Sequence, residues 1–361
     1  MTPRRRAEDF TRVEAQLRAI ERGDGDGDLT FGDGTTLRVS SLAKPFFPKA
    51  GVTKGGLMRY YTRVAPYLLP EIDGRPLVLK RYPDGVAGPM FFQQNAGDHV
   101  PDVVRVATLD TVELGAKPRI VGGDLATLLY TVQLGAIEVH PWLSRVDDVD
   151  APDRCLIDLD PGDDVSFADV AQLAREVIRI AETCGLTVAV KTSGASGIHL
   201  VLPLPARTSY ETSAELALRL AEAVVASSPA TATVERSVKS RPQKSIYVDA
   251  LQNARGKSMA APYSVRARPA ASVSAPLRPR ELTSRLRIEA FTIGNIPARV
   301  TRVGDLWGDA IATRPTTRIL ARAMATLQAA STAPPPRRGG SGRRRAGGTH
   351  AGSTGRRARR T

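Results

Sequence analysis

Short apolar runs alternate with segments of helical periodicity between residues 155 and 250. The run "CLIDLDPGDD", which begins at Cys155, is typical of a buried strand because apolar residues dominate it and a Pro-Gly pair ends it. In "VSFADVAQLAREVIRIAETCG" apolar residues recur every three or four positions, which predicts a helix. Ser166 and Asp169 form an approximate capping box at its start, and Gly185 marks its end.

The next segments predict two strands, "LTVAVKTS" and "IHLVLPL", joined by a turn at "GASG". A helix at about residues 210–227 and a strand, "SIYVDAL", follow them. The resulting order β-α-β-β-α-β is the split βαβ or ferredoxin-like arrangement of an α+β protein. In such a sheet the first and last strands are usually neighbours.

Three aspartates interrupt these apolar strands. Asp158 and Asp160 lie two positions apart, so both side chains point to one face of their strand, where like charges resist joint ionisation. Asp249, on the last strand, is expected beside them. Three carboxylates from adjacent strands suit Mg²⁺ or Mn²⁺, and two such ions about 3.5–4 Å apart support phosphoryl transfer. Alternatively, Asp160 only starts a turn, and Asp249 pairs with Arg255 or Lys257.

Composition and charge narrow the class of protein. The 361 residues are 42% hydrophobic and carry a net charge of +14, which predicts a polyanionic partner, with nucleic acid favoured over membrane. No apolar run approaches the roughly 18 residues of a membrane span, and the first residues do not resemble a secretory signal. Cys155 and Cys184 lie in apolar contexts, so we expect reduced thiols in a cytoplasmic, nucleoid-associated protein.

The two ends differ from the body in composition. Residues 337–361 contain nine arginines and no acid, and without them a net charge of +5 remains (14 − 9). We expect a disordered Arg-rich tail over residues 332–361, serving either as a nucleic-acid tether or for solubility. Residues 1–30 are expected to form a helix and a flexible linker. A calcium loop in "GDGDGDLTFGDGT" is unfavourable because Leu29 and Thr35 occupy two required positions.

Several strings together resemble the polymerase domain of bacterial DNA ligase D, a member of the archaeo-eukaryotic primase superfamily. They are "IDLDP", "KTSGASGIHLVLPL", "YVDALQNARGKSMAAPYSVRARP", "RPLVLKRYPDGVAGPMFFQQNA" and "LGAIEVHPWLSR", and the likeness covers roughly residues 37–310. The resemblance implies an archaeo-eukaryotic primase fold, with a split βαβ (ferredoxin/RRM-like) catalytic sheet packed against an N-terminal α/β subdomain. We place the primase-polymerase domain at residues 31–310 and a C-terminal helix at 311–331.

The resemblance assigns Asp158, Asp160 and Asp249 to two catalytic metal ions. Nucleotide-binding roles are implied for five further residues: His140, Ser193, Arg266, Lys80 and Gln252. The chemistry of the residues fits, because Ser193 and backbone N–H groups of the "KTSG" turn can cradle phosphates, and a guanidinium pairs with them bidentately. On the residues alone, His140 and His199 are both more typical of a satisfied core histidine; the resemblance moves only His140 to the nucleotide.

Contacts with DNA are implied for a second group of residues. The adjacent Phe91 and Phe92 match a platform for the template, although two aromatics after Gly and Pro can also plug a core. Arg81 adds basic charge nearby. Lys44 and Lys54, the latter in the first turn of a helix capped by Thr53, match lysines that grip a 5′-phosphate; solvated surface lysines are the alternative.

Two positions depart from the family pattern. Ser41 replaces an Asn of the 5′-phosphate pocket, and Ser196 replaces a Lys of the "KTSG" turn. The second change removes a positive charge from the expected triphosphate pocket, unless Lys191 substitutes for it. Nucleotide affinity is then expected to be lower, whereas catalysis is not excluded, because the three metal-binding acids are present.

The resemblance implies a two-metal nucleotidyltransferase that adds nucleotides, often ribonucleotides, to DNA 3′ ends under template direction. Gap filling and end extension in non-homologous end joining follow from it, with Ku and a separate DNA ligase as partners. One alternative is a DNA-binding accessory protein with a weakened polymerase site. A two-metal nuclease is less suitable, because a nuclease does not need a triphosphate cradle.

Overall fold

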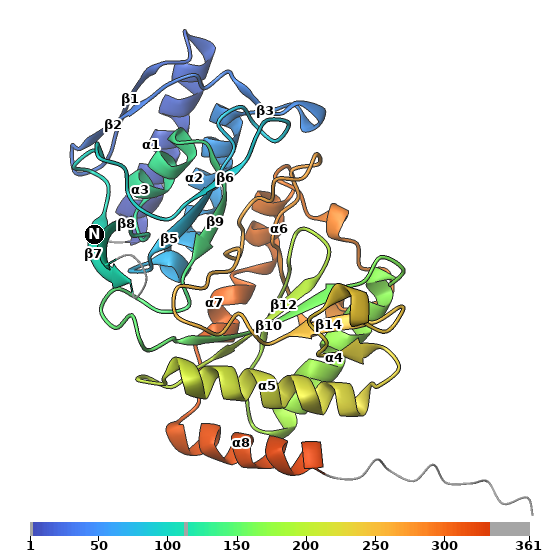
Figure 1. The fold of residues 1–361 in the computed structure, drawn as a ribbon. Helices are drawn as coiled ribbons and strands as arrows, with labels where there is room; N and C mark the ends of the chain where they lie inside the picture. The colour runs from blue at the N-terminus through green and yellow to red at the C-terminus, as the bar shows by residue number, and fades with distance from the viewer. Residues whose placement is uncertain (1–2, 112–114, 333–361) are drawn as a thin grey trace, which may run out of the picture.

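The computed structural model describes residues 3–111 and 115–332, and its largest sheet has six strands (Figure 1). In spatial order the strands are β13 (Ala232–Thr233), β14 (Ile246–Asp249), β10 (Arg154–Pro161), β12 (Ile198–Pro203), β11 (Ala189–Thr192) and β15 (Pro276–Leu277). Helix α4 (Phe167–Thr183) connects β10 to β11, and α5 (Tyr210–Ser227) follows β12. The predicted β-α-β-β-α-β order and the pairing of its first and last strands, β10 and β14, are confirmed.

Helix α4 begins where the sequence indicates. Ser166 caps it by accepting a hydrogen bond from the Asp169 backbone N–H, and Gly185, just past its end, has a φ of 77° that favours glycine. Both α4 and α5 pack on the same face of the sheet, and the Cys155 thiol donates to the Ser213 carbonyl in α5. Because strand side chains alternate, Asp158 and Asp160 point to the other face, away from these helices.

A smaller layer, blue to teal in Figure 1, lies against that other face. Its three-stranded sheet has the order β6-β5-β9; helix α3 packs on β9, α2 packs on α3, and α1 packs on α2. The strands are β6 (Phe91–Gln93), β5 (Leu77–Arg81) and β9 (Ala136–Pro141); the helices are α1 (Pro3–Arg22), α2 (Lys54–Ile72) and α3 (Leu125–Gln133). Three hairpins complete the layer: β1 (Gly27–Thr30) with β2 (Thr36–Val39), β3 (Pro45–Phe47) with β4 (Val52–Thr53), and β7 (Val106–Thr111) with β8 (Gly115–Ile120).

The prediction of a flexible linker within residues 1–30 is wrong for residues 27–30, because they form β1, which pairs with β2 in a regular antiparallel ladder. Leu29 and Leu37 are direct partners in that pair, and both side chains are fully buried in the core. Between the strands, Gly34 turns the chain with a φ of 86°. Gly27 and Asp28 lie within β1 and the other Asp and Gly residues in the turns around it; the apolar positions of the hairpin alternate, and their burial stabilises it.

The two layers share one hydrophobic core. Tyr60 and Tyr61 of α2 connect them. The Tyr60 hydroxyl donates to the Tyr263 carbonyl (2.8 Å), and the Tyr61 hydroxyl donates to the Ile137 carbonyl of β9 (2.7 Å) and accepts from the Val265 N–H (3.1 Å). This shared core holds β9 and the strand that carries Asp158 in a defined relation.

The C-terminal part closes the structure. It contains α6 (Ile296–Val303), α7 (Leu306–Ile311) and α8 (Thr317–Thr332), and α8 packs on the outside of α5 (Figure 1). Four short 3₁₀ helices lie at η1 (Pro48–Ala50), η2 (Val238–Ser240), η3 (Pro279–Glu281) and η4 (Ile288–Ala290). A membrane-spanning helix is absent from the described segments, since none combines sufficient length with sufficient apolarity. The Arg-rich tail lies outside the described residues.

Candidate active site

A row of four polar side chains crosses the main sheet on the face away from α4 and α5. Asp249 pairs with Asp158, Asp158 with His199, and His199 with Lys191, on strands β14, β10, β12 and β11 in turn. Directly paired residues share a face of the sheet, so these side chains form one line. His199, which the sequence left open, therefore belongs to the site: its Nε2 lies 3.5 Å from Asp158 Oδ1.

The negative charges of the carboxylates in this row are only partly balanced by neighbouring groups. Asp158 is half-buried, and desolvation together with the charges of Asp160 and Asp249 raises its pKa to about 7. Asp249 accepts from the Leu251 backbone N–H and the Gln252 amide, each at 2.8 Å. Gln252, predicted to bind the nucleotide, thus donates a hydrogen bond to one of the three acids.

The alternative pairing of Asp249 with Arg255 is wrong, because the Arg255 guanidinium is 2.8 Å from the Asp150 carboxylate. A cation that the sequence did not indicate lies nearby instead. Arg241 stands 3.6 Å from the Asp160 carboxylate, with its guanidinium 4.2 Å from the centre of the Tyr247 ring. Its position in a loop rich in basic residues gave no signal that one of them would reach an acid of the site.

The chemistry of the three acids fits hard divalent cations. Aspartate oxygens are the donors that Mg²⁺ and Mn²⁺ prefer, and the three acids share one end of two paired strands. The pKa of Asp158 is raised by desolvation and by the charges of Asp160 and Asp249, which Lys191 and Arg266 do not fully offset. Within residues 3–111 and 115–332, however, no three His, Cys, Asp or Glu side chains stand close enough to enclose an ion as they are.

The "KTSG" turn lies beside this row and is tightly built. Ser193 Oγ accepts hydrogen bonds from the backbone N–H groups of Ala195, Ser196 and Gly197 at 2.9–3.2 Å, so its own hydroxyl hydrogen remains to donate. Gly194 has a φ of 71°, and a Cβ there would come within 2.7 Å of Arg266 Cγ. Only glycine allows this close approach of the turn to Arg266.

Lys191 does not substitute for the Lys that Ser196 replaces. Its side chain is fully buried, and its Nζ contacts His199 Nδ1 at 2.6 Å and Ser274 Oγ at 2.8 Å. Desolvation holds its pKa well below the ordinary value of a lysine. Ser196 itself is exposed on the turn, so the charge missing at this position is not supplied by Lys191.

Three predicted nucleotide-binding residues converge on an acid that the sequence analysis missed. Glu138 of β9 is 2.8 Å from His140 Nε2, 3.0 Å from Arg266 Nε and 3.3 Å from Lys80 Nζ. Arg266 also donates to the Ser193 carbonyl, which ties the cluster to the "KTSG" turn. A glutamate flanked by apolar residues in "GAIEVHPW" gives no signal of this role until strands β5 and β9 are paired.

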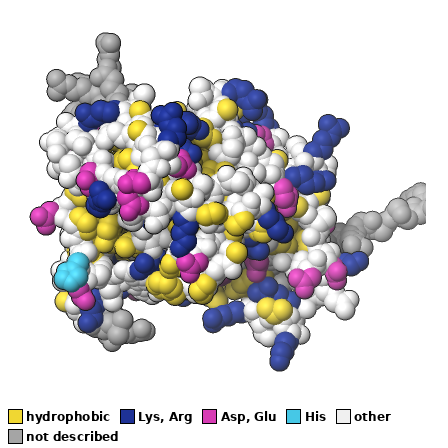
Figure 2. Space-filling view, turned by 90° about the horizontal axis from the view of Figure 1, so that it is seen from above, with side chains coloured by type: hydrophobic (Ala, Val, Ile, Leu, Met, Phe, Trp, Pro, Cys, Tyr) yellow, Lys and Arg dark blue, Asp and Glu magenta, His cyan; other side chains and the backbone are white. Residues whose placement is uncertain are grey.

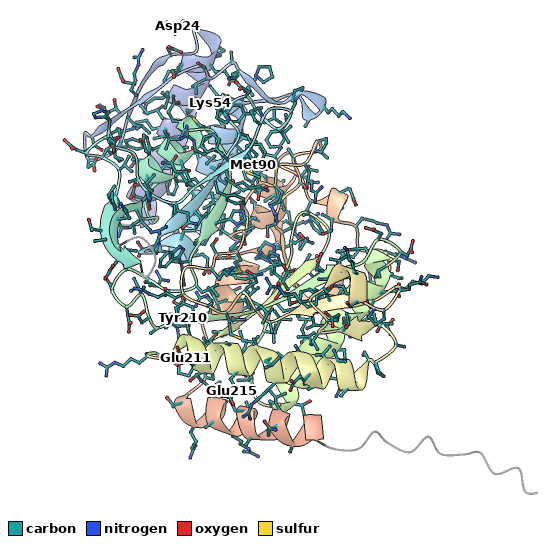
Figure 3. All side chains as sticks on the ribbon, viewed as in Figure 1. Asp24, Lys54, Met90, Tyr210, Glu211 and Glu215 are labelled. Atoms are coloured by element: carbon teal, nitrogen blue, oxygen red, sulfur yellow. The ribbon has the colours of Figure 1, made fainter. Side chains whose placement is uncertain are left out.

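The predicted template platform is exposed. Phe91 and Phe92 of β6 are 45% and 61% exposed, so the alternative of a core plug is wrong. Their neighbour Met90 lies near the middle of Figure 3, where the two layers meet. The Arg81 guanidinium lies 5.0 Å from the centre of the Phe91 ring and donates to the Leu134 carbonyl, so it holds that ring from one side.

The two predicted 5′-phosphate lysines differ in their surroundings. Thr53 caps α2 as expected, by accepting from the Gly56 N–H, and Lys54 (Figure 3) is only 6% exposed with its Nζ donating to the Ser40 carbonyl at 2.9 Å. Burial and the nearby charge of Lys44 lower the pKa of Lys54 to about 8, so it is not a solvated surface lysine. Lys44 forms an exposed ion pair with Asp84 at 2.7 Å.

Ser41 occupies a strained position next to this pocket. Its φ of 57° lies in the left-handed region, which asparagine tolerates better than serine, so the family Asn matches this backbone. Figure 2 shows Lys and Arg side chains spread over the upper face of the molecule with hydrophobic side chains between them. Such a surface is compatible with a polyanionic partner.

Comparison with known proteins identifies the family. The LigD primase-polymerase domain matches residues 53–307. The chain is 35% identical over 269 residues to the bifunctional non-homologous end joining protein LigD of Bacillus subtilis, covering 74% of this chain and 43% of that protein. It is 30% identical over 281 residues to the multifunctional LigD of Pseudomonas aeruginosa, covering 77% of this chain and 33% of that protein.

A solved structure agrees with these matches. The polymerase domain of Mycobacterium tuberculosis ligase D, in complex with DNA, superposes with a TM-score of 0.71 at 31% identity, over 77% of this chain and 99% of that domain. The chain spans less than half the length of either curated relative, so the likeness concerns one domain of those larger proteins. This chain therefore belongs to the family of LigD primase-polymerase domains.

Proposed function

We propose that this protein is a DNA-directed primase-polymerase that adds nucleotides, ribonucleotides included, to DNA 3′ ends. The observation that carries the proposal is the direct pairing of Asp158 with Asp249, with Asp160 on the same face and the "KTSG" turn beside them. An oxygen-rich group and a phosphate cradle in one place are what nucleotidyl transfer requires. Family membership supports the proposal, as does the similar M. tuberculosis domain, whose structure is a complex with DNA.

The reaction joins the DNA 3′ oxygen to the α-phosphorus of a nucleoside triphosphate. The bond between that phosphorus and the oxygen of the leaving pyrophosphate breaks, and the hydroxyl proton passes to solvent. Asp158, Asp160 and Asp249 would hold two Mg²⁺ or Mn²⁺ ions, which when bound supply charge stabilisation and a more acidic hydroxyl.

The remaining residues bind and orient. Arg266, Lys80 and the Ser193 hydroxyl would donate to the triphosphate; we call the group of residues around Glu138 and the "KTSG" turn the phosphate pocket. Gln252 donates to the Asp249 carboxylate and holds it in place. Phe91 and Phe92 would stack on template bases, and Lys54 with Lys44 would bind the 5′-phosphate across a gap. Family membership supports gap filling in non-homologous end joining, with Ku and a DNA ligase as proposed partners in the cytoplasm.

Primer extension tests the proposal. Purified protein with Mn²⁺ should extend the 3′ end of a gapped duplex with templated nucleotides and should favour a 5′-phosphate at the gap. The same reaction on an unprimed single strand separates gap filling from primer synthesis. DNA binding without any metal-dependent incorporation would instead support an accessory protein with a weakened site, the role that Ser196 alone favours.

A further inference from the structure

Glu138 is buried at the centre of the phosphate pocket, with only 2% of its side chain exposed. Its Oε1 accepts from Lys80 Nζ and from the Ala267 backbone N–H at 3.1 Å, and its Oε2 accepts from Arg266 Nε and His140 Nε2. A carboxylate has about four acceptor sites, so both oxygens of Glu138 are fully used.

The carboxylate remains ionised in this setting. Burial raises the pKa of Glu138, but the hydrogen bond from His140 and the positive charges of Arg266 and Lys80 outweigh burial and hold the pKa far below its ordinary range. The charge of Glu138 thus allows two cations and an imidazole to lie close together before any anion is bound.

The two cationic partners of Glu138 keep donors for which the described residues provide no acceptor. Arg266 uses Nε on Glu138 and Nη1 on the Ser193 carbonyl, which leaves Nη2. Lys80 has three N–H groups, of which one points to Glu138, and its side chain is 22% exposed. The free donors belong to Lys80 on β5 and to Arg266 on the loop after β14. Both side chains are held by the same acid, Glu138.

We propose that Glu138 is a positioning residue of the phosphate pocket, fixing Arg266 and Lys80, with the His140 ring beside them, so that the free donors of these two cations converge on the phosphates of a nucleoside triphosphate. This inference rests on the proposed polymerase function. It extends that function by identifying the residue that orients the donors of the pocket, an acid that does not itself contact the phosphates.

A positioning role and a purely electrostatic role of Glu138 predict opposite changes in nucleotide affinity when the acid is removed. If Glu138 acted only through its charge, removing a negative charge beside an anion site would strengthen nucleotide binding. If it acts by positioning, removal leaves Arg266 and Lys80 repelling each other in partly buried places, and binding weakens. The two accounts predict opposite changes in the same measurement.

The experiment compares Glu138→Gln with the wild-type protein on gapped DNA with Mn²⁺. Glu138→Gln keeps the shape and one acceptor oxygen, but one oxygen cannot accept both from Arg266 and His140 and from Lys80 and the Ala267 N–H. We expect KM for the nucleotide to rise at least about tenfold, with a smaller change in kcat, because oriented charge-assisted hydrogen bonds are lost. The inhibition constant of inorganic pyrophosphate should rise in parallel, whereas DNA affinity should not change.

Glu71→Gln is the matched control, since Glu71 is equally buried and pairs with Arg154 at 2.9 Å outside the pocket. A Glu138→Gln protein with wild-type thermal stability and an unchanged or lower KM would overturn the proposal, as would an equal KM rise in Glu71→Gln. If Glu138→Gln does not fold, Glu138→Asp decides, because the retracted carboxylate should raise KM and a wild-type value would refute positioning. Absence of nucleotide addition by the wild-type protein would refute the polymerase function instead.

Discussion

Asp158 and Asp249 are direct partners across the antiparallel strands β10 and β14. Direct partners in such a ladder have Cβ atoms about 4.5–5.5 Å apart, so the two carboxylates lie close together and repel each other. Asp160 adds a third negative charge, and desolvation together with the charges of Asp160 and Asp249 raises the pKa of Asp158 to about 7. The strand pairing therefore places negative charges together in a way that favours bound cations at this part of the sheet.

Asp158→Asn should abolish nucleotide addition while leaving DNA binding nearly intact. We expect a loss of at least about a hundredfold in kcat, because charge stabilisation at the reacting phosphate is removed. Mn²⁺ should raise the melting temperature of the wild-type protein and not that of the variant, since ligands that bind the folded state stabilise it. Primer extension and thermal unfolding with and without Mn²⁺ measure both effects.

Asp164→Asn serves as the control for this variant. Asp164 follows β10 on an exposed turn, so its loss changes the net charge equally without changing the row of acids. Near wild-type extension by Asp158→Asn would show that the metal assignment is wrong. A similar loss in Asp164→Asn would point to charge alone.

The acids could be predicted because both signals are local or topological: spacing by two puts Asp158 and Asp160 on one face, and the β-α-β-β-α-β order brings in Asp249. Glu138 could not be predicted in this way. Its partners Lys80 and Arg266 lie 58 and 128 residues away; the pairing of β5 with β9 brings in Lys80, and the packing of the two layers brings in Arg266.

Two other differences have similar physical causes. Lys191 is close to Ser196 in sequence, but the alternation of β11 directs its side chain into the buried polar row. In residues 27–39 the abundance of Asp and Gly obscures the alternating apolar positions that form the hairpin of β1 and β2. Composition indicated a linker, whereas burial of Leu29 and Leu37 determined the structure.

Ser196→Lys should strengthen nucleotide binding. Ser196 is exposed on the turn whose backbone Ser193 organises, so a lysine there can reach a phosphate without displacing buried groups. We expect KM to fall roughly three- to tenfold, since a partly exposed charged contact contributes about 1 kcal/mol. Ser196→Gln, of similar length but uncharged, is the control, and an equal gain in both variants would contradict an electrostatic cause.

The preference for a 5′-phosphorylated gap should decline as pH rises. Lys54 has a pKa lowered to about 8, so it loses its proton progressively above that pH, while the phosphate stays dianionic. Extension of phosphorylated over unphosphorylated gaps, compared between about pH 7 and about pH 9.5, should show this decline. The sign follows because only the protonated amine attracts the phosphate.

Two variants bracket the pH effect. Lys54→Ala should show little preference at any pH and should still extend a simple primer-template. Lys49→Ala removes an exposed lysine of η1 and should behave like the wild-type protein. A pH-independent preference in the wild-type protein would mean that Lys54 is not the group that recognises the phosphate.

The arginines of residues 337–361 should add salt-dependent, sequence-independent affinity for DNA. Nine arginines without an acid can contact phosphates, and each contact on duplex DNA contributes roughly 0.9 to the slope of log affinity against log salt. Removal of these residues should therefore weaken binding at low salt and flatten that slope. Turnover at saturating DNA should persist, because the acids and the phosphate pocket lie within residues 80–266.

A full-length variant with the nine arginines replaced by glutamine keeps the length of the segment and should behave like the truncation. Superimposable salt slopes for all three proteins would show that the segment does not contact DNA, and its charge would then serve solubility or a protein partner.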